Sequence, residues 1–110
     1  MKKLTKKQIK AQEKKEVNKK FKEWSTLVKN RDNNKCVICE ETNRLNAHHI
    51  IGRYNKELRF DINNGISLCP YHHMFCKEIS GHKNAFMLAI WLMKNRPKQF
   101  KYLIKNAYKG

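Results

Sequence analysis

Two short ligand pairs constrain the fold of this chain more than any other feature. Cys36 and Cys39 form a C-x-x-C pair, and thirty residues further on Cys69 and His72 form a C-x-x-H pair. Two such pairs supply the four sulfur and nitrogen ligands of a tetrahedral structural zinc site. A closed four-ligand site leaves no open position for chemistry, so we expect one zinc ion per chain that stabilises the fold.

Cys76 is an alternative fourth ligand, one helical turn beyond His72. His72 is favoured because it keeps the x-x spacing, and Cys76 is otherwise expected to be a small buried core residue. Disulfides are disfavoured. No apolar segment or cleavage site of a secretory signal follows the lysine-rich first residues, so we expect a cytoplasmic protein with reduced thiols.

The charge of the chain predicts a polyanionic partner. Lys and Arg number 25 against 9 Asp and Glu, which is a formal net charge of +16. The length, 110 residues, fits one domain with a modest core. Nucleic acid is the first choice of partner. An anionic membrane surface is disfavoured, because the longest apolar stretch, residues 85–93, is far shorter than a bilayer span.

The apolar pattern predicts a small α+β fold in the order helix, strand, strand, helix and helical tail. Val17, Phe21, Trp24 and Val28 recur on one helical face, so residues 1–31 are expected to form one long basic helix. Its first dozen residues are rich in lysine and weakly periodic, which predicts fraying or disorder. The lysine run is either a solvated face or an arm that contacts nucleic acid.

The zinc-stapled core is expected over residues 32–82. Residues 44–51 and 65–68 are extended in character and predict two short strands, separated by an irregular loop over 52–64. A short helix over 71–77 is expected after the second knuckle, because the proline there favours the first turn of a helix. Three apolar side chains are expected to anchor the loop, namely Tyr54, Leu58 and Phe60.

Residues 83–110 are expected to form the helical tail. Ser80 is a candidate N-cap for a helix over 83–95, and Pro97 separates it from a last helix over 97–107. Four apolar residues predict the buried face of the first of these helices, namely Phe86, Ala89, Ile90 and Met93. Three more predict that of the second, namely Phe100, Leu103 and Ile104.

Two adjacent histidines, His48 and His49, lie in the first expected strand. Side chains of adjacent strand residues point to opposite faces, so the two histidines cannot do the same job. Hydrolysis of a phosphodiester requires a base that takes a proton from water, a divalent cation that offsets negative charge, and a group that holds the base. One histidine can therefore reach a metal near the following helix while the other faces a water molecule.

The segments AHHI, NNGISLC and PYHH resemble the HNH nuclease family. The family motif is Asp or His followed by His, then an Asn, then a His on the next helix. The matches are His48, His49, Asn64 and His73, and the Asn keeps the family's N-x-x-x-L-C spacing to the second knuckle. The resemblance covers residues 34–86, and the segments NGISLC-x-x-HH and SGHKNAF look most like small bacterial and phage HNH proteins.

The resemblance implies a ββα-metal finger and a metal-dependent endonuclease that hydrolyses DNA. His49 would be the general base, since a pKa near 6.5 suits proton abstraction at neutral pH. His48 and His73 would bind the catalytic divalent ion, and Asn64 would hold the loop and the base in position. Where many members carry another His, one turn after the last motif His, this chain has Lys77.

The implied metal shell therefore consists of two histidines with water and phosphate oxygens, which suits Mg²⁺. Imidazole ligands also accept Mn²⁺ or Ni²⁺. His82 is an alternative third ligand, and its other interpretation is a surface or capping histidine. Four basic residues flank the motif as candidate contacts for substrate phosphates, namely Arg53, Lys56, Arg59 and Lys77.

Two other functions share part of this pattern. A non-catalytic zinc module that binds nucleic acid through charge explains the knuckles and the charge, but not the joint presence of His48, His49 and Asn64. The second alternative is an accessory nuclease, either of a phage packaging machine beside a terminase or of a restriction system. The expected partner is double-stranded DNA in the cytoplasm of a bacterium or phage-infected host cell, and a homodimer is expected if both strands are cut.

Overall fold

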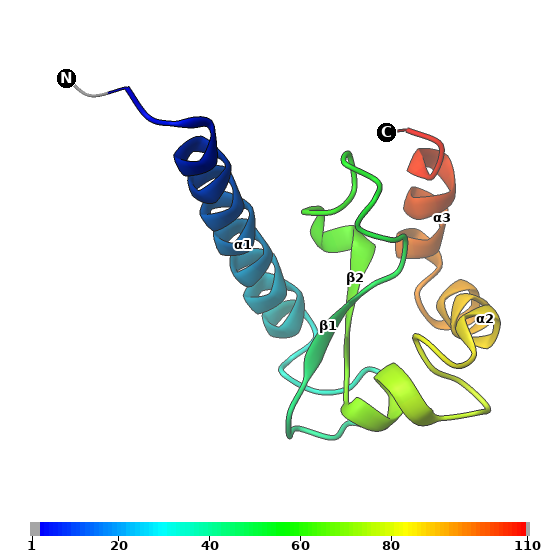
Figure 1. Ribbon diagram of the computed structural model, residues 1–110. Helices are drawn as coiled ribbons and strands as arrows, with labels where there is room; N and C mark the ends of the chain where they lie inside the picture. Colours follow the sequence, from blue (N-terminus) through cyan, green and yellow to red (C-terminus); the bar gives the residue numbers. More distant parts are fainter. Residues whose placement is uncertain (1–2, 110) are drawn as a thin grey trace.

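The computed structural model describes residues 3–109. Its first element is a long helix, α1 (Lys6–Arg31) (Figure 1). Its N-cap is Thr5: the hydroxyl accepts a hydrogen bond from the Gln8 amide, and the Gln8 side chain accepts one from the Thr5 amide. This capping box satisfies amides that the first turn leaves unpaired. The helix is therefore regular from Lys6, where the sequence predicted fraying. The first two residues of the predicted helix lie outside the described range.

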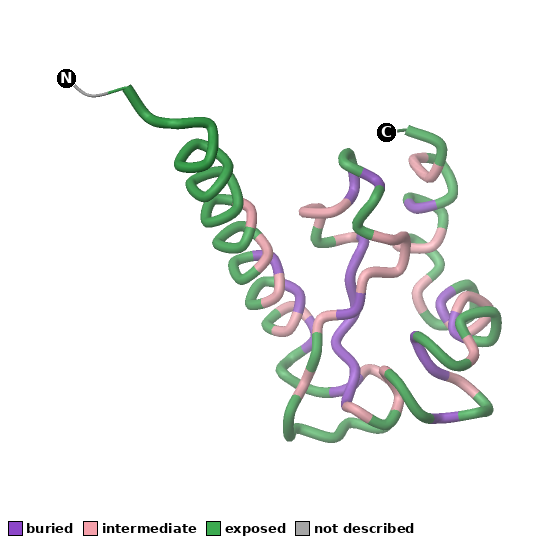
Figure 2. The backbone as a smooth tube through the Cα atoms, in the orientation of Figure 1, coloured by how far each residue is buried: buried purple, intermediate pink, exposed green. Residues whose placement is uncertain are grey.

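The C-terminal half of α1 packs on the rest of the molecule, and its N-terminal half is exposed (Figure 2). Trp24 and Val28 are buried, and Val17 and Phe21 are half-buried, which confirms the predicted apolar face. Gly65 lies beneath this face, and a Cβ there would stand 2.6 Å from the Trp24 ring and 2.7 Å from Val28. The missing side chain at Gly65 is what lets α1 approach the sheet.

Two strands, β1 (Asn46–His49) and β2 (Gly65–Leu68), pair as an antiparallel sheet in which His49 lies opposite Gly65. β2 matches the predicted strand, and β1 is shorter than the predicted 44–51. All four residues of β2 are buried, because α1 covers one face of the sheet and the C-terminal helices lie on the other (Figure 1).

The loop between the strands ends in a 3₁₀ turn, η1 (Ile62–Asn64). Leu58 is buried and Phe60 half-buried, as predicted, but Tyr54 is 82% exposed, so its prediction as an anchor was wrong. Asn55 anchors the loop instead. It is buried, and its side-chain oxygen accepts a hydrogen bond from the Leu58 amide.

Three helical segments follow the sheet, namely the π-helical turn η2 (Tyr71–Phe75), α2 (Ala85–Asn95) and α3 (Pro97–Asn106). η2 is shorter than the predicted 71–77 and ends with a hydrogen bond from the Cys76 amide to the Tyr71 carbonyl. No helix of the described residues is long and apolar enough to cross a membrane.

The N-cap and the buried face of α2 differ from the prediction. Asn84 caps the helix by accepting from the Met87 amide, whereas the Ser80 hydroxyl binds the Lys83 and Asn84 amides before the helix begins. Phe86 is 74% exposed, and Met93 is also exposed. The buried residues of α2 are Leu88 and Leu92.

The hydrophobic core joins the knuckles, β2 and α2. Its buried members are Cys36, Ile66, Leu68, Cys69, Leu88 and Leu92. The segment predicted as a tail is thus part of the core. On α3, Leu103 is buried and Phe100 packs partly against the core, but Ile104 is exposed.

A buried carboxylate, Asp32, connects three parts of the fold. It accepts a hydrogen bond from the Ser67 amide of β2 at 2.9 Å and pairs with the guanidinium groups of Arg31 and Arg96. Burial by itself raises the pKa of Asp32, but the hydrogen bonds from Arg31 and Arg96 outweigh burial and the pKa is lowered. The end of α1, the sheet and the α2–α3 junction are therefore joined through one charged group.

Candidate functional site

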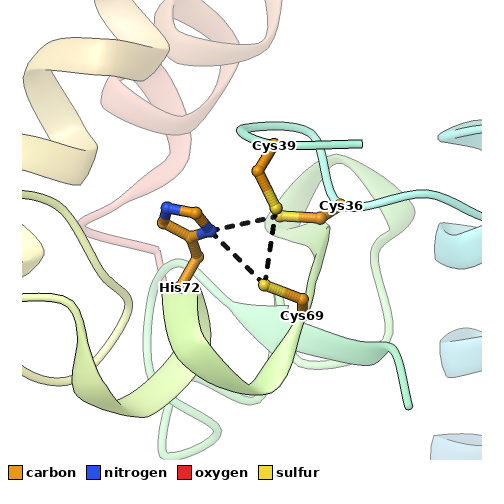
Figure 3. Close-up of side chains that lie close together, drawn as sticks. All are labelled: Cys36, Cys39, Cys69 and His72. Atoms are coloured by element: carbon orange, nitrogen blue, oxygen red, sulfur yellow. Dashed lines mark hydrogen bonds between the residues drawn. The ribbon is translucent and has the colours of Figure 1, made fainter. Parts of the chain in front are cut away.

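A Cys₃His cluster forms where the two predicted knuckles meet (Figure 3). Cys36 and Cys39 follow α1, Cys69 follows β2, and His72 lies on η2. The Cys39 sulfur is 3.6 Å from that of Cys69, and His72 Nδ1 is 3.3 Å from Cys69 Sγ and 3.8 Å from Cys36 Sγ. A zinc tetrahedron with Zn–S bonds of about 2.3 Å has edges of about 3.8 Å. The donor atoms therefore fit a zinc ion, and these four residues could hold one.

Local electrostatics also suit a cation in this cluster. Burial raises the pKa of Cys36, but hydrogen bonds from backbone amides, first that of Cys69, outweigh burial and lower it. Burial and the neighbouring sulfurs raise the pKa of Cys39 to about 11. Amides that face Cys36 stabilise the thiolate, which is the form that binds metal, while three crowded sulfurs cannot all ionise without a positive ion between them.

The fourth position of the cluster belongs to His72 and not to Cys76. Cys76 is buried, and its thiol donates to Glu78 Oε2 at 3.3 Å, away from the other sulfurs. A single turn that ends at Phe75 carries His72 toward the knuckles and Cys76 past them. Cys76 is therefore a small buried core residue, which was the alternative to its being the fourth ligand.

A second group of possible metal ligands consists of His48, His73 and His82, one ring nitrogen of each lying within 4.8 Å of the others. They come from β1, η2 and the loop before α2. His73 Nε2 and His82 Nε2 are 3.2 Å apart. The His82 amide also donates to the His73 carbonyl at 2.9 Å, so the backbone itself holds these two residues together. His82, which the sequence offered as an alternative third ligand, is therefore part of this cluster.

The His48 ring is enclosed by the loop that carries His82. Its pKa is lowered to about 3, chiefly by burial and then by the nearby His73 and His82. Gly81 allows this enclosure, because a Cβ there would stand 2.7 Å from the His48 ring. Burial also lowers the pKa of His73. His48 and His73 are therefore neutral at neutral pH, as a coordinating imidazole must be.

His49 lies on the other side of β1, in an aromatic environment. Its ring is stacked on Trp24, with 3.8 Å between centroids, and meets the edge of Phe21. Its Nε2 is 2.8 Å from the Arg59 carbonyl oxygen. Because a carbonyl oxygen only accepts, Nε2 carries the proton and Nδ1 the lone pair. Burial lowers the pKa of His49, and Arg53 adds to the effect.

Asn64 connects the sheet to the loop that holds His49. It is fully buried, accepts from the Ile51 amide at 2.7 Å, and donates to the carbonyls of Ile51 and Leu58. The carbonyl that binds His49 belongs to Arg59, the next residue along. Asn64 thus holds both ends of the loop segment behind the His49 ring.

A cleft of about 570 Å³ contains both histidine sites. Its walls include His48, His49, His73 and His82, together with aromatic residues of α1. Arg53 is the flanking basic residue that lines this cleft, and its guanidinium lies over the Phe21 ring.

The other predicted phosphate contacts lie elsewhere. Lys56 and Lys77 are exposed and do not line the cleft. Arg59 lies over Phe60, and its buried Nε has no hydrogen-bond partner among the described residues.

Sequence reasoning missed the role of Trp24. Its indole donates to the Asp61 carbonyl at 2.8 Å, which fixes the ring on which His49 stacks. The pairing of His49 with Gly65 across the strands makes the stacking possible, since α1 approaches there. A glycine in a buried strand is a signal of such an approach.

Comparisons with protein-family models, curated proteins and solved structures found no match to this chain.

Proposed function

We propose that this chain is a metal-dependent endonuclease of the HNH type, with a ββα-metal core, that hydrolyses phosphodiester bonds in DNA. One observation carries the proposal: His48 and His49 point to opposite sides of β1 and yet both line one cleft. His48 belongs to a ligand cluster, and His49 has the ring orientation of a base. A base and a metal-ligand set around one cavity are the groups that hydrolysis of a phosphodiester requires.

His49 would take the proton from the attacking water. With Nε2 donating to the Arg59 carbonyl, Nδ1 is the atom that accepts it. Burial keeps the pKa of His49 low, so the ring is neutral before the reaction. Stacking on Trp24 and the bond to the Arg59 carbonyl hold the ring in one orientation, which is the function of the third member in a nucleophile–base–orienter arrangement.

His48, His73 and His82 would hold the catalytic ion, which supplies a positive charge that offsets negative charge on the phosphate and the leaving oxygen. The three donor atoms, all imidazole nitrogens within 4.8 Å of one another, fit a single cation. Imidazoles suit Mn²⁺, Ni²⁺ or Zn²⁺ better than Mg²⁺, which prefers oxygen ligands. We therefore propose a transition metal here, in place of the Mg²⁺ that a two-histidine shell implied.

Arg53 would bind the substrate phosphate in the cleft. Its guanidinium lies over Phe21 and lines the same cavity as the histidines. A guanidinium placed by an aromatic ring can meet two phosphate oxygens without further ordering. The positive charge of Arg53 would then add to that of the metal ion in the same cleft.

The proposal is tested by incubating supercoiled plasmid with the wild type and with His49→Ala, in the presence of Mg²⁺, Mn²⁺, Ni²⁺ or Zn²⁺. We expect the wild type to nick plasmid and His49→Ala to be slower by about 10²–10⁴-fold, the usual contribution of a general base. The control is Tyr108→Ala, at a side chain that is 98% exposed, which should cut at the wild-type rate. Zinc content and far-UV circular dichroism verify that all three proteins are folded.

Two results would overturn this assignment. Nicking that persists in His49→Ala would remove the role of His49. Duplex binding by a wild type that cuts with none of the four metals would favour the non-catalytic zinc module. An accessory nuclease of a packaging or restriction machine would still show the His49 dependence, so this experiment tests the chemistry and not the pathway.

A further inference from the structure

The apolar face of α1 is continued by lysines beyond the body of the molecule. Side chains three or four residues apart lie on the same face of a helix. Counted back in such steps from Val17, where the apolar face ends, the next residues are Lys14, Lys10 and Lys6. These three residues, which we call the lysine row, therefore lie on the side of α1 that faces the cleft.

The lysine row lies on the part of α1 that extends away from the sheet (Figure 1). All three side chains are exposed. With a rise of 1.5 Å per residue, the row is about 12 Å long, and Lys14 lies about 15 Å along the helix axis from Trp24. Because Trp24 lines the cleft, the row extends one wall of the cleft in a straight line.

Positive charge is in excess along this row, although Glu13 lies beside Lys10 and Lys14. The helix carries ten basic and three acidic residues. The ion pairs found in the described part of the chain both involve Asp32, so they leave the lysine row unpaired. Lysines that are exposed and unpaired can replace the counterions of a nucleic-acid backbone at little cost.

The composition of α1 favours duplex over single-stranded nucleic acid. Proteins that bind single strands combine basic residues with aromatic rings on which bases stack. Between Lys6 and Lys20 the helix has no aromatic residue. Its first aromatic rings, Phe21 and Trp24, already contact Phe60 and His49. A rigid row of charge without stacking surfaces matches the phosphate backbone of a double helix.

We propose that the lysine row binds the backbone of double-stranded DNA and directs the duplex to the cleft. This inference rests on the proposed function, because the cleft is where that DNA would be cut. It assigns to Lys6, Lys10 and Lys14 a share of the binding energy that depends on salt and not on base sequence.

The test compares two triple variants with the same change of charge. Lys6→Gln/Lys10→Gln/Lys14→Gln removes the row, and Lys15→Gln/Lys19→Gln/Lys22→Gln removes three exposed lysines from the opposite face of the same helix. Binding to a fluorescein-labelled DNA duplex is measured by anisotropy over a range of salt, without added divalent metal. Gln keeps the helix propensity of Lys, and circular dichroism verifies the helix.

We expect the row variant to bind at least tenfold more weakly than the wild type at low salt, with a slope of log Kd against log salt reduced by about 2–3. The increase in log Kd of the opposite-face variant should be less than a third of the increase in the row variant. Equal losses in both variants would overturn the proposal, because binding would then follow total charge. One labelled strand of the same DNA serves as a second probe, and a larger loss of binding to this single strand than to the duplex would overturn the choice of duplex.

Failure of this inference and failure of the proposed function are distinguishable. A wild type that binds through the row but cuts with no metal would retain this inference and refute the nuclease. Cleavage that keeps its wild-type dependence on DNA concentration in the row variant would retain the nuclease and refute the row.

Discussion

At the scale of single residues, Asn64 determines whether the loop behind His49 keeps its shape. Asn64→Ala removes three hydrogen bonds from a fully buried site and leaves the amide and the carbonyl of Ile51 unpaired, whereas the Leu58 carbonyl keeps its hydrogen bond from the Asp61 amide. We expect the free energy of unfolding to fall by about 2–4 kcal/mol, measured by urea denaturation with zinc present. Asn46→Ala removes one local hydrogen bond at an exposed position and should change it by less than about 0.5 kcal/mol. Similar losses of unfolding free energy in the two variants would contradict the role of Asn64 in holding the loop.

At the scale of elements, Asp32 joins α1 to β2 and to the α2–α3 junction. Asp32→Asn keeps the size of the side chain but leaves Arg31 and Arg96 without a counter-charge beside a buried group. Breaking a buried pair on one side costs on the order of 3 kcal/mol. We expect a loss of this size in urea denaturation at pH 7, where the lowered pKa of Asp32 keeps the wild-type carboxylate ionised.

The control for Asp32 is Glu13→Gln, which makes the same change of charge on the exposed part of α1. It should leave the free energy of unfolding within about 0.5 kcal/mol of the wild type. If Asp32→Asn were equally mild, the three elements would be held together by apolar packing alone, and the ion pairs would be incidental to the docking of α1.

At the scale of the whole molecule, the Cys₃His cluster connects the segment after α1 to β2 and η2. Binding of structural zinc contributes roughly 10–16 kcal/mol in small zinc-dependent domains, which is comparable to the whole net stability of about 5–15 kcal/mol of a typical folded protein. We therefore expect Cys36→Ser to lose one zinc per chain, measured by elemental analysis, and to lose the cooperative thermal transition followed by circular dichroism.

Cys76→Ser is the matched control, because Cys76 is also buried and lies outside the cluster. It should keep the zinc content of the wild type and unfold cooperatively, at a lower temperature because a polar hydroxyl replaces a buried thiol. Loss of zinc from Cys76→Ser but not from Cys36→Ser would reverse the assignment of the ligands.

Local pattern and tertiary contact contributed differently to the candidate site. The two knuckles and the division of His48 from His49 follow from spacing and from the period of a strand, so the sequence could predict them. The sequence could offer His82 only as an alternative third ligand, because its place in the cluster depends on a loop that folds back and hydrogen-bonds to His73. The stacking of Trp24 on His49 depends likewise on where α1 crosses the sheet.

The sequence by itself determined the order of the elements, the ligands that could hold zinc and the basic character of α1, because each depends on residues close together in the chain. Only the tertiary structure decided which face of α2 is buried. Leu88 and Leu92, and not Phe86 and Met93, face the core, since an almost wholly apolar helix offers several faces and the surface it meets selects one. Contacts between segments far apart in the chain likewise bring the two histidine sites to one cleft.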